Sequence, residues 1–151
     1  MPTVKNYLSL VKFSHTIFAM PFALIGFFVA IFIGLDLPFT KIQWGMPYPG
    51  EPVTYYTGLK GLLVILILVI ICMITARSAA MAFNRYLDRH FDARNPRTAI
   101  REIPAGIISA NGALWFTIIN CIVFIAATWF INLLCFFLSP VALFVILFYS
   151  Y

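Results

Sequence analysis

The sequence has few charged residues: Asp, Glu, Lys and Arg make up 10% of its 151 residues, and five of these are acidic. Hydrophobic residues account for 63% and aromatic residues for 17%, and the mean hydropathy is +0.99. This composition lies outside the range of soluble domains and predicts an integral membrane protein in contact with lipid. Membrane orientation explains the formal charge of +5 better than a nucleic-acid-binding face does, so no nucleic-acid partner is expected.

Cysteine is also scarce, and none of it shows C-x-x-C spacing. Cys72, Cys121 and Cys135 lie in apolar segments without a neighbouring histidine. This pattern predicts neither a disulfide framework nor a zinc site. We expect the three thiols to be small hydrophobic side chains that face lipid or protein.

Long apolar runs predict transmembrane helices at about residues 15–35, 59–92 and 113–130, the first bent near Pro21. Ser139 and Pro140 are typical of an N-cap and first helical position, and predict a fourth helix over 140–151. Its 12 residues would span about 18 Å, less than the hydrocarbon core of about 30 Å. The predicted fold is therefore an all-α, multi-helix transmembrane bundle. It forms a single domain over residues 1–151 that is incomplete at its C-terminus.

The segment between the first two predicted helices, residues 36–58, is rich in proline and glycine and predicts a loop. Its aromatic residues are typical of side chains at a membrane interface. They are Trp44, Tyr48, Tyr55 and Tyr56.

The second predicted helix changes from bulky residues to small ones at residues 75–82, which read TARSAAMA. Small side chains allow helices to approach closely, so we expect this half to be buried in the bundle. Arg77 lies within it. An arginine at this depth either faces a polar cavity or extends toward the interface, and both interpretations stay open.

A charged segment follows, in which Asn84, Asp88 and Asp92 recur every four residues. On a helix these residues share one face with Arg77, with a drift of about 80° between Asn84 and Asp92. Aspartate oxygens can bind Mg²⁺ and leave positions for phosphate oxygens, while arginines bind the remaining phosphate charge. The nearby arginines are Arg85, Arg89, Arg94, Arg97 and Arg101. The pattern predicts a Mg²⁺-bound diphosphate whose apolar tail lies between the helices.

The alternative interpretation of this segment is a solvated helix end with local ion pairs, such as Asp88 with Arg85 or Asp92 with Arg89. The distribution of basic residues bears on orientation in either case. If the N-terminus and the loop after the aspartates share a side, that side holds seven of the ten Lys and Arg residues. The positive-inside rule then predicts an inner (cytoplasmic) membrane protein whose N-terminus and aspartates are cytoplasmic.

The stretch NRYLDRHFD, from Asn84 to Asp92, resembles the first aspartate-rich motif, NxxxDxxxD, of the UbiA superfamily of intramembrane prenyltransferases. SHTIFAMPFAL, ARSAAMAFNRYLDRHFDARNPRTA and LSPVALFVILFYSY are similar to its quinone-biosynthesis branch. The stretch REIPAG departs from the commoner RPLPAG at Glu102 and Ile103, which leaves the sub-branch open.

The resemblance implies nine transmembrane helices around a central cavity. It also implies Mg²⁺-dependent transfer of a polyprenyl chain from its allylic diphosphate to an aromatic acceptor. In this branch the acceptor is 4-hydroxybenzoate or a menaquinone precursor, and the products serve ubiquinone or menaquinone biosynthesis. The residues implied are Asn84, Asp88 and Asp92 for the metal, Asp88 and Asp92 for catalysis, and Asn84, Arg77, Arg97 and Arg101 for the diphosphate.

The family pattern also includes a second aspartate motif that these 151 residues do not contain, so we expect them to be inactive alone. Three alternatives stay open. The first is a prenyltransferase with a haem or chlorophyll precursor as acceptor. The second is a cation transporter whose path is lined by Arg77, Asp88 and Asp92. The third is a structural membrane subunit.

Overall fold

The computed structural model describes residues 3–33, 42–43, 55–56 and 59–149. Most of the loop expected at residues 36–58 lies outside these ranges. The interface roles expected for Trp44 and Tyr48 fall in that part and stay predictions.

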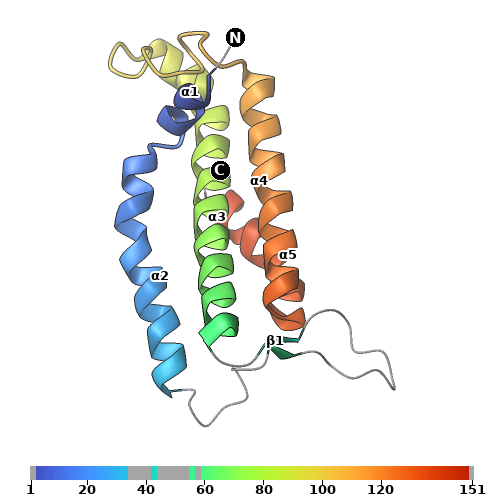
Figure 1. Cartoon of the computed structure of the whole chain (residues 1–151). Helices are drawn as coiled ribbons and strands as arrows, with labels where there is room; N and C mark the ends of the chain where they lie inside the picture. Colours follow the sequence, from blue (N-terminus) through green and yellow to red (C-terminus); the bar gives the residue numbers. More distant parts are fainter. Residues whose placement is uncertain (1–2, 34–41, 44–54, 57–58, 150–151) are drawn as a thin grey trace.

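The described chain forms a helical bundle (Figure 1). Two short strands, β1 and β2, pair antiparallel at the end of the bundle opposite α1, with Ile42 opposite Tyr56. The elements are α1 Val4–Leu10, α2 Phe13–Ile33, β1 Ile42–Gln43, β2 Tyr55–Tyr56, α3 Leu59–Arg94, α4 Ala110–Ile131 and α5 Leu133–Phe148.

Helix α3 is the central element and packs most extensively against α4. Ala79 and Ala82 on α3 and Ala113 on α4 are fully buried. Small side chains at the contact let the two backbones approach closely. The prediction that the small-residue half of this helix is buried in the bundle is confirmed.

Two helical segments in the described ranges are long and apolar enough to cross a membrane, Gly61–Arg94 and Ala110–Ile131. Large apolar side chains lie exposed on both, among them Ile67, Ile119 and Ile122. Exposed apolar residues on long helices are what a lipid environment requires.

One end of the bundle is closed by α1 and the loop of residues 95–109, which lie on the same side (Figure 1). Leu10 and Val11 are buried there against Ile103 and Ile108 of the loop. The Ser9 hydroxyl also donates a hydrogen bond to Glu102. The condition for the orientation prediction, that the N-terminus and this loop share a side, is therefore met. Helix α1 itself was not predicted.

The predicted start of the fourth helix at Pro140 is wrong, because α5 begins seven residues earlier, at Leu133. Asn132 is its N-cap, and its side chain accepts a hydrogen bond from the Leu134 N–H at 3.0 Å. Pro140 has no N–H to donate to the carbonyl of Phe136. The Ser139 hydroxyl donates to that carbonyl instead, at 2.7 Å, so the helix continues through the proline.

Candidate functional site

An open cleft of about 400 Å³ lies on α3 beneath the end of the bundle that α1 and the loop close. Its residues come from α3, the α1–α2 corner, the loop and the end of α5. They are Lys12, Ala80, Met81, Asn84, Arg85, Asp88, Arg101 and Tyr149.

The structure brings together three of the residues predicted for the site. Asn84 and Asp88 are separated by one helical turn, and both line the cleft together with Arg101. The cleft holds two further cations, Lys12 and Arg85. The sequence analysis gave Lys12 no role in the site, and it named Arg85 only as one of five arginines near the aspartates.

Arg77 and Arg97 do not line the cleft in the described part of the chain. Nε of Arg77 is buried and has no hydrogen-bond partner among the described residues. Arg97 is exposed, and its backbone N–H donates to Asn95 Oδ1 at 3.0 Å. The diphosphate-binding roles expected for Arg77 and Arg97 stay predictions.

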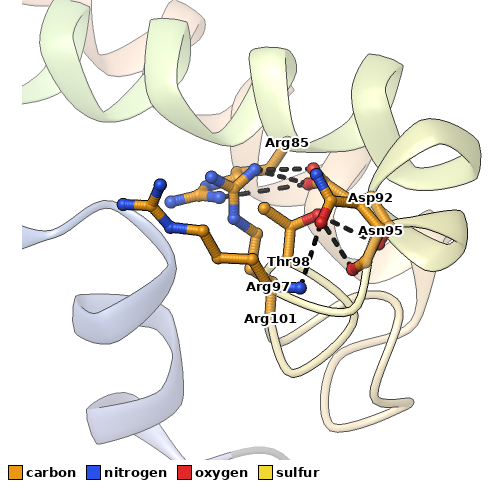
Figure 2. A network of polar contacts seen from close by, with 6 residues as sticks. All are labelled: Arg85, Asp92, Asn95, Arg97, Thr98 and Arg101. Carbon is orange, nitrogen blue, oxygen red and sulfur yellow. Dashed lines mark hydrogen bonds and ion pairs between the residues drawn. The ribbon is translucent and has the colours of Figure 1, made fainter.

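Asp92 is buried at 7% exposure, and its side chain points toward Arg85 and Arg101 (Figure 2). Nη1 of Arg101 donates to both of its carboxylate oxygens, each at 2.7 Å. Nη1 of Arg85 lies 4.0 Å from Oδ2 of the same carboxylate. Asp92 thus joins two arginines that both reach the cleft.

The chain beyond α3 turns back so that Arg101 can reach Asp92. The Asp92 carbonyl accepts hydrogen bonds from the Thr98 hydroxyl at 3.0 Å and from the Asn95 N–H at 3.3 Å. The carbonyl of Asn95 in turn accepts from the N–H groups of Thr98 and Ala99 at 2.9 and 2.8 Å. These contacts convert the helix end into a compact turn and set the path of the following residues.

The local ion pairs considered as an alternative do not form among the residues that the structure describes. Nη1 of Arg89 donates instead to the Tyr86 carbonyl at 2.6 Å, and its guanidinium carbon lies 4.3 Å from the centre of the Tyr86 ring. Asp92 pairs with an arginine nine residues away and Asp88 lines the cleft, so this helix end is not simply a solvated one.

The cleft favours an anion. Three cations, Lys12, Arg85 and Arg101, line it with one carboxylate, that of Asp88. Arg85 is 9% exposed, and its Nη1 has no hydrogen-bond partner among the described residues. Lys12 has a left-handed backbone, with φ of 43°, at the corner between α1 and α2. Buried guanidinium groups are costly unless an anion or a hydrogen-bond acceptor satisfies them.

The fit of these residues to Mg²⁺ is partial. No group of three or more His, Cys, Asp and Glu side chains comes together in the described ranges. Mg²⁺ is commonly held by one or two carboxylates together with substrate phosphates and water, which Asn84 and Asp88 can supply from one wall of the cleft. Asp92 does not line the cleft in the described ranges, and Nη1 of Arg101 contacts both of its oxygens, so its expected metal-binding and catalytic roles stay predictions.

A family model described as the UbiA prenyltransferase family matches residues 50–151, which include α3, the loop, α4 and α5. The chain belongs to the UbiA prenyltransferase family. The resemblance drawn from the aspartate motif is thereby confirmed, and so is the expected fold class, an all-helical membrane bundle.

Curated relatives in this family carry two different names. Protoheme IX farnesyltransferase of Acidiphilium cryptum is 45% identical over 67 residues, 39% of this chain and 21% of the relative. The 4-hydroxybenzoate octaprenyltransferase of Vibrio cholerae is 40% identical over 50 residues, 33% of this chain and 18% of the relative. That of Hydrogenovibrio crunogenus is 35% identical over 68 residues, 45% of this chain and 24% of the relative.

The chain thus spans about a fifth of the length of the UbiA relatives it matches. No solved structure matches it. The family match begins at residue 50, so α1 and Lys12 lie outside it. The contribution of Lys12 to the cleft could be recognised from the three-dimensional arrangement alone.

Proposed function

We propose that the full-length protein transfers a polyprenyl chain from an allylic polyprenyl diphosphate to an aromatic acceptor. The observation that carries this proposal is the composition of the cleft. Asn84 and Asp88 of the UbiA motif face the same space as Lys12, Arg85 and Arg101, at the end of an apolar helical bundle. A charged head with a long apolar tail suits such a position.

In this proposal the cationic side chains bind the diphosphate. Arg85 and Arg101 donate hydrogen bonds to phosphate oxygens, and Lys12 adds a third positive charge. As the allylic carbon–oxygen bond breaks, its electron pair stays on the diphosphate, and these groups stabilise the added negative charge. Mg²⁺, held by Asn84 and Asp88, would supply Lewis-acid stabilisation of the same leaving group.

The prenyl tail would lie along the apolar part of the bundle. Ala80 and Met81 form the apolar wall of the cleft on the side of α3 that leads toward the middle of the helix. Tail and head would thus be recognised by adjacent parts of the same helix.

We propose 4-hydroxybenzoate or a menaquinone precursor as acceptor, in ubiquinone or menaquinone biosynthesis. The matched 4-hydroxybenzoate octaprenyltransferases support this choice. A porphyrin acceptor is the second candidate, because a matched protoheme IX farnesyltransferase is 45% identical over the aligned segment. Turnover of the full-length protein with a panel of both acceptor types distinguishes them.

The orientation proposed is cytoplasmic for the N-terminus and the cleft. The common location of α1 and the loop of residues 95–109 supports it, since their basic residues then lie on one side. The 151 residues carry a single aspartate motif, and we expect them to show no turnover on their own.

The test is prenyl transfer by the full-length protein in membranes, with Mg²⁺, a radiolabelled polyprenyl diphosphate and each acceptor. We expect Arg85→Gln to raise the KM for the diphosphate at least about tenfold, since it removes a buried donor. Arg94→Gln is the matched control, because Arg94 is exposed on the same helix. Ion flux without any response to diphosphate would support the transporter instead, and an unchanged KM for the diphosphate in Arg85→Gln would contradict the assignment of the cleft.

A further inference from the structure

We propose that Asp92 is a positioning residue, which holds Arg101 and Arg85 in the wall of the cleft, and that Asp88 alone of the two motif aspartates faces the ligand. This inference rests on the proposed function, because it assigns roles within the same diphosphate site. It departs from the equal roles that the four-residue spacing predicts for the two carboxylates.

The contacts of Asp92 are already those of a completed ion pair. Its two oxygens each lie 2.7 Å from Nη1 of Arg101, and its side chain is 9% exposed. Nη1 of Arg85 is 4.0 Å from Oδ2. A metal ion bound to Asp92 would have to share both oxygens with Arg101 and would place two further positive charges beside two guanidinium groups.

Asp88 has a different environment. It is half-buried and lines the cleft with Asn84, and no cation lies within ion-pair distance of it among the described residues. Residues four apart on a helix differ in direction by about 40°, so Asp92 is rotated by about 80° from Asn84. This rotation turns Asp92 toward the loop, while Asn84 and Asp88 still face the cleft.

Arg101 needs an anionic partner, which Asp92 supplies, to hold its side chain in place. It lies in the loop after α3, outside any helix, and its side chain is 32% exposed. A long, flexible side chain on a loop loses conformational entropy when it binds a ligand, unless another contact has already restricted it. The ion pair with Asp92 restricts Arg101 before the ligand arrives, and the turn formed by Asn95 and Thr98 fixes the distance between the two residues.

The test uses the full-length protein in detergent and measures binding, independently of turnover. Mn²⁺ replaces Mg²⁺ as a paramagnetic probe for metal affinity, and titration calorimetry with inorganic pyrophosphate reports anion affinity. The variants are Asp92→Asn, Asp88→Asn, Arg101→Gln and the double variant Asp92→Asn with Arg101→Gln. Arg101→Gln alone leaves the buried Asp92 carboxylate without its arginine, and this can prevent folding. The double variant has no such unpaired carboxylate, so binding can be measured on it even if a single variant does not fold.

We expect Asp92→Asn and Arg101→Gln to weaken pyrophosphate binding alike, by about tenfold or more, with Mn²⁺ affinity within about twofold of the unmodified protein. The double variant should bind pyrophosphate as weakly as Arg101→Gln does, because Asp92 acts through Arg101. Asp88→Asn should lose Mn²⁺ affinity.

Loss of Mn²⁺ affinity in Asp92→Asn, or in the double variant relative to Arg101→Gln, would overturn the inference and leave the proposed function intact. Absence of pyrophosphate binding by the unmodified protein in the presence of metal would overturn the proposed function and this inference with it.

Discussion

Replacing Leu10 by alanine tests how the N-terminal segment is attached to the cleft. Leu10 is the last residue of α1 and is 0% exposed, in a cluster with Val11, Ile103 and Ile108. Lys12, two residues later, lines the cleft. We expect Leu10→Ala to let α1 detach from the bundle without unfolding the long helices.

The magnitude follows from the burial of Leu10. The substitution removes three carbon atoms from a fully buried position, which costs about 2.4 kcal/mol at about 0.8 kcal/mol for each group. The cavity left behind raises the total to about 3 kcal/mol. Since 1.4 kcal/mol corresponds to a factor of ten, opening of α1 becomes about 150-fold more frequent.

Hydrogen exchange of backbone amides in detergent micelles measures this opening directly. The reporters are the N–H groups of Tyr7, Val11 and Lys12, which donate to the carbonyls of Thr3, Tyr7 and Ser9. Their exchange should accelerate in Leu10→Ala by about two orders of magnitude. Amides in the middle of α3 and α4 should keep their protection.

Leu8→Ala is the control, because Leu8 is on the same helix and 44% exposed. Equal exchange rates in the two variants would refute the claim that Leu10 anchors α1. A second measurement connects this anchor to function. Since Lys12 moves with α1, the KM for the diphosphate should rise in Leu10→Ala and remain unchanged in Leu8→Ala.

Three other substitutions test the packing and the site. Ala82→Leu adds volume to a fully buried position between α3 and α4 and should lower the free energy of unfolding by about 1–3 kcal/mol, measured by thermal unfolding. Ala126→Leu, at an exposed position of α4, is its control and should have little effect. Ser109→Ala removes the N-cap of α4, whose Oγ accepts from the Gly112 N–H at 3.1 Å, and should cost about 1 kcal/mol in the same assay. Asp88→Asn should abolish prenyl transfer while the amount of protein in the membrane stays constant. Substantial activity in that variant would remove Asp88 from the site.

The long helices were predictable because the length of an apolar run is a direct consequence of bilayer thickness. Helix α3 ends at Arg94, two residues beyond the predicted end and just before the Asn95–Pro96 pair that disfavours a helix. Helix α1 was missed because seven residues show too few turns for a recognisable period. The start of α5 was misplaced because the sequence alone does not distinguish a proline inside a helix from one at its first position. The hydrogen bond from the Ser139 hydroxyl to the Phe136 carbonyl, which shows that the helix continues through Pro140, is visible in the structure alone.

The candidate site was predictable in part. The four-residue spacing correctly brought Asn84 and Asp88 to one surface, since that relation lies within a single helix. The roles of Arg77 and Arg97 were carried over from a family pattern, and in this structure neither lines the cleft. Lys12 could not be found from spacing, because a lysine before a transmembrane helix is more often an orientation signal.

Composition and periodicity alone therefore establish a helical membrane protein with a polar motif at one end of a long helix. Both features can be read from the sequence because the apolar length needed to cross lipid and the helical repeat relate residues that are close together along the chain. The partner of Asp92 was decided by the tertiary structure, since it depends on how residues 95–101 turn back over the helix. The same holds for Lys12, which reaches the cleft because Leu10 and Val11 bury α1 against the loop. Contacts between distant residues follow from packing, which spacing along the chain does not encode.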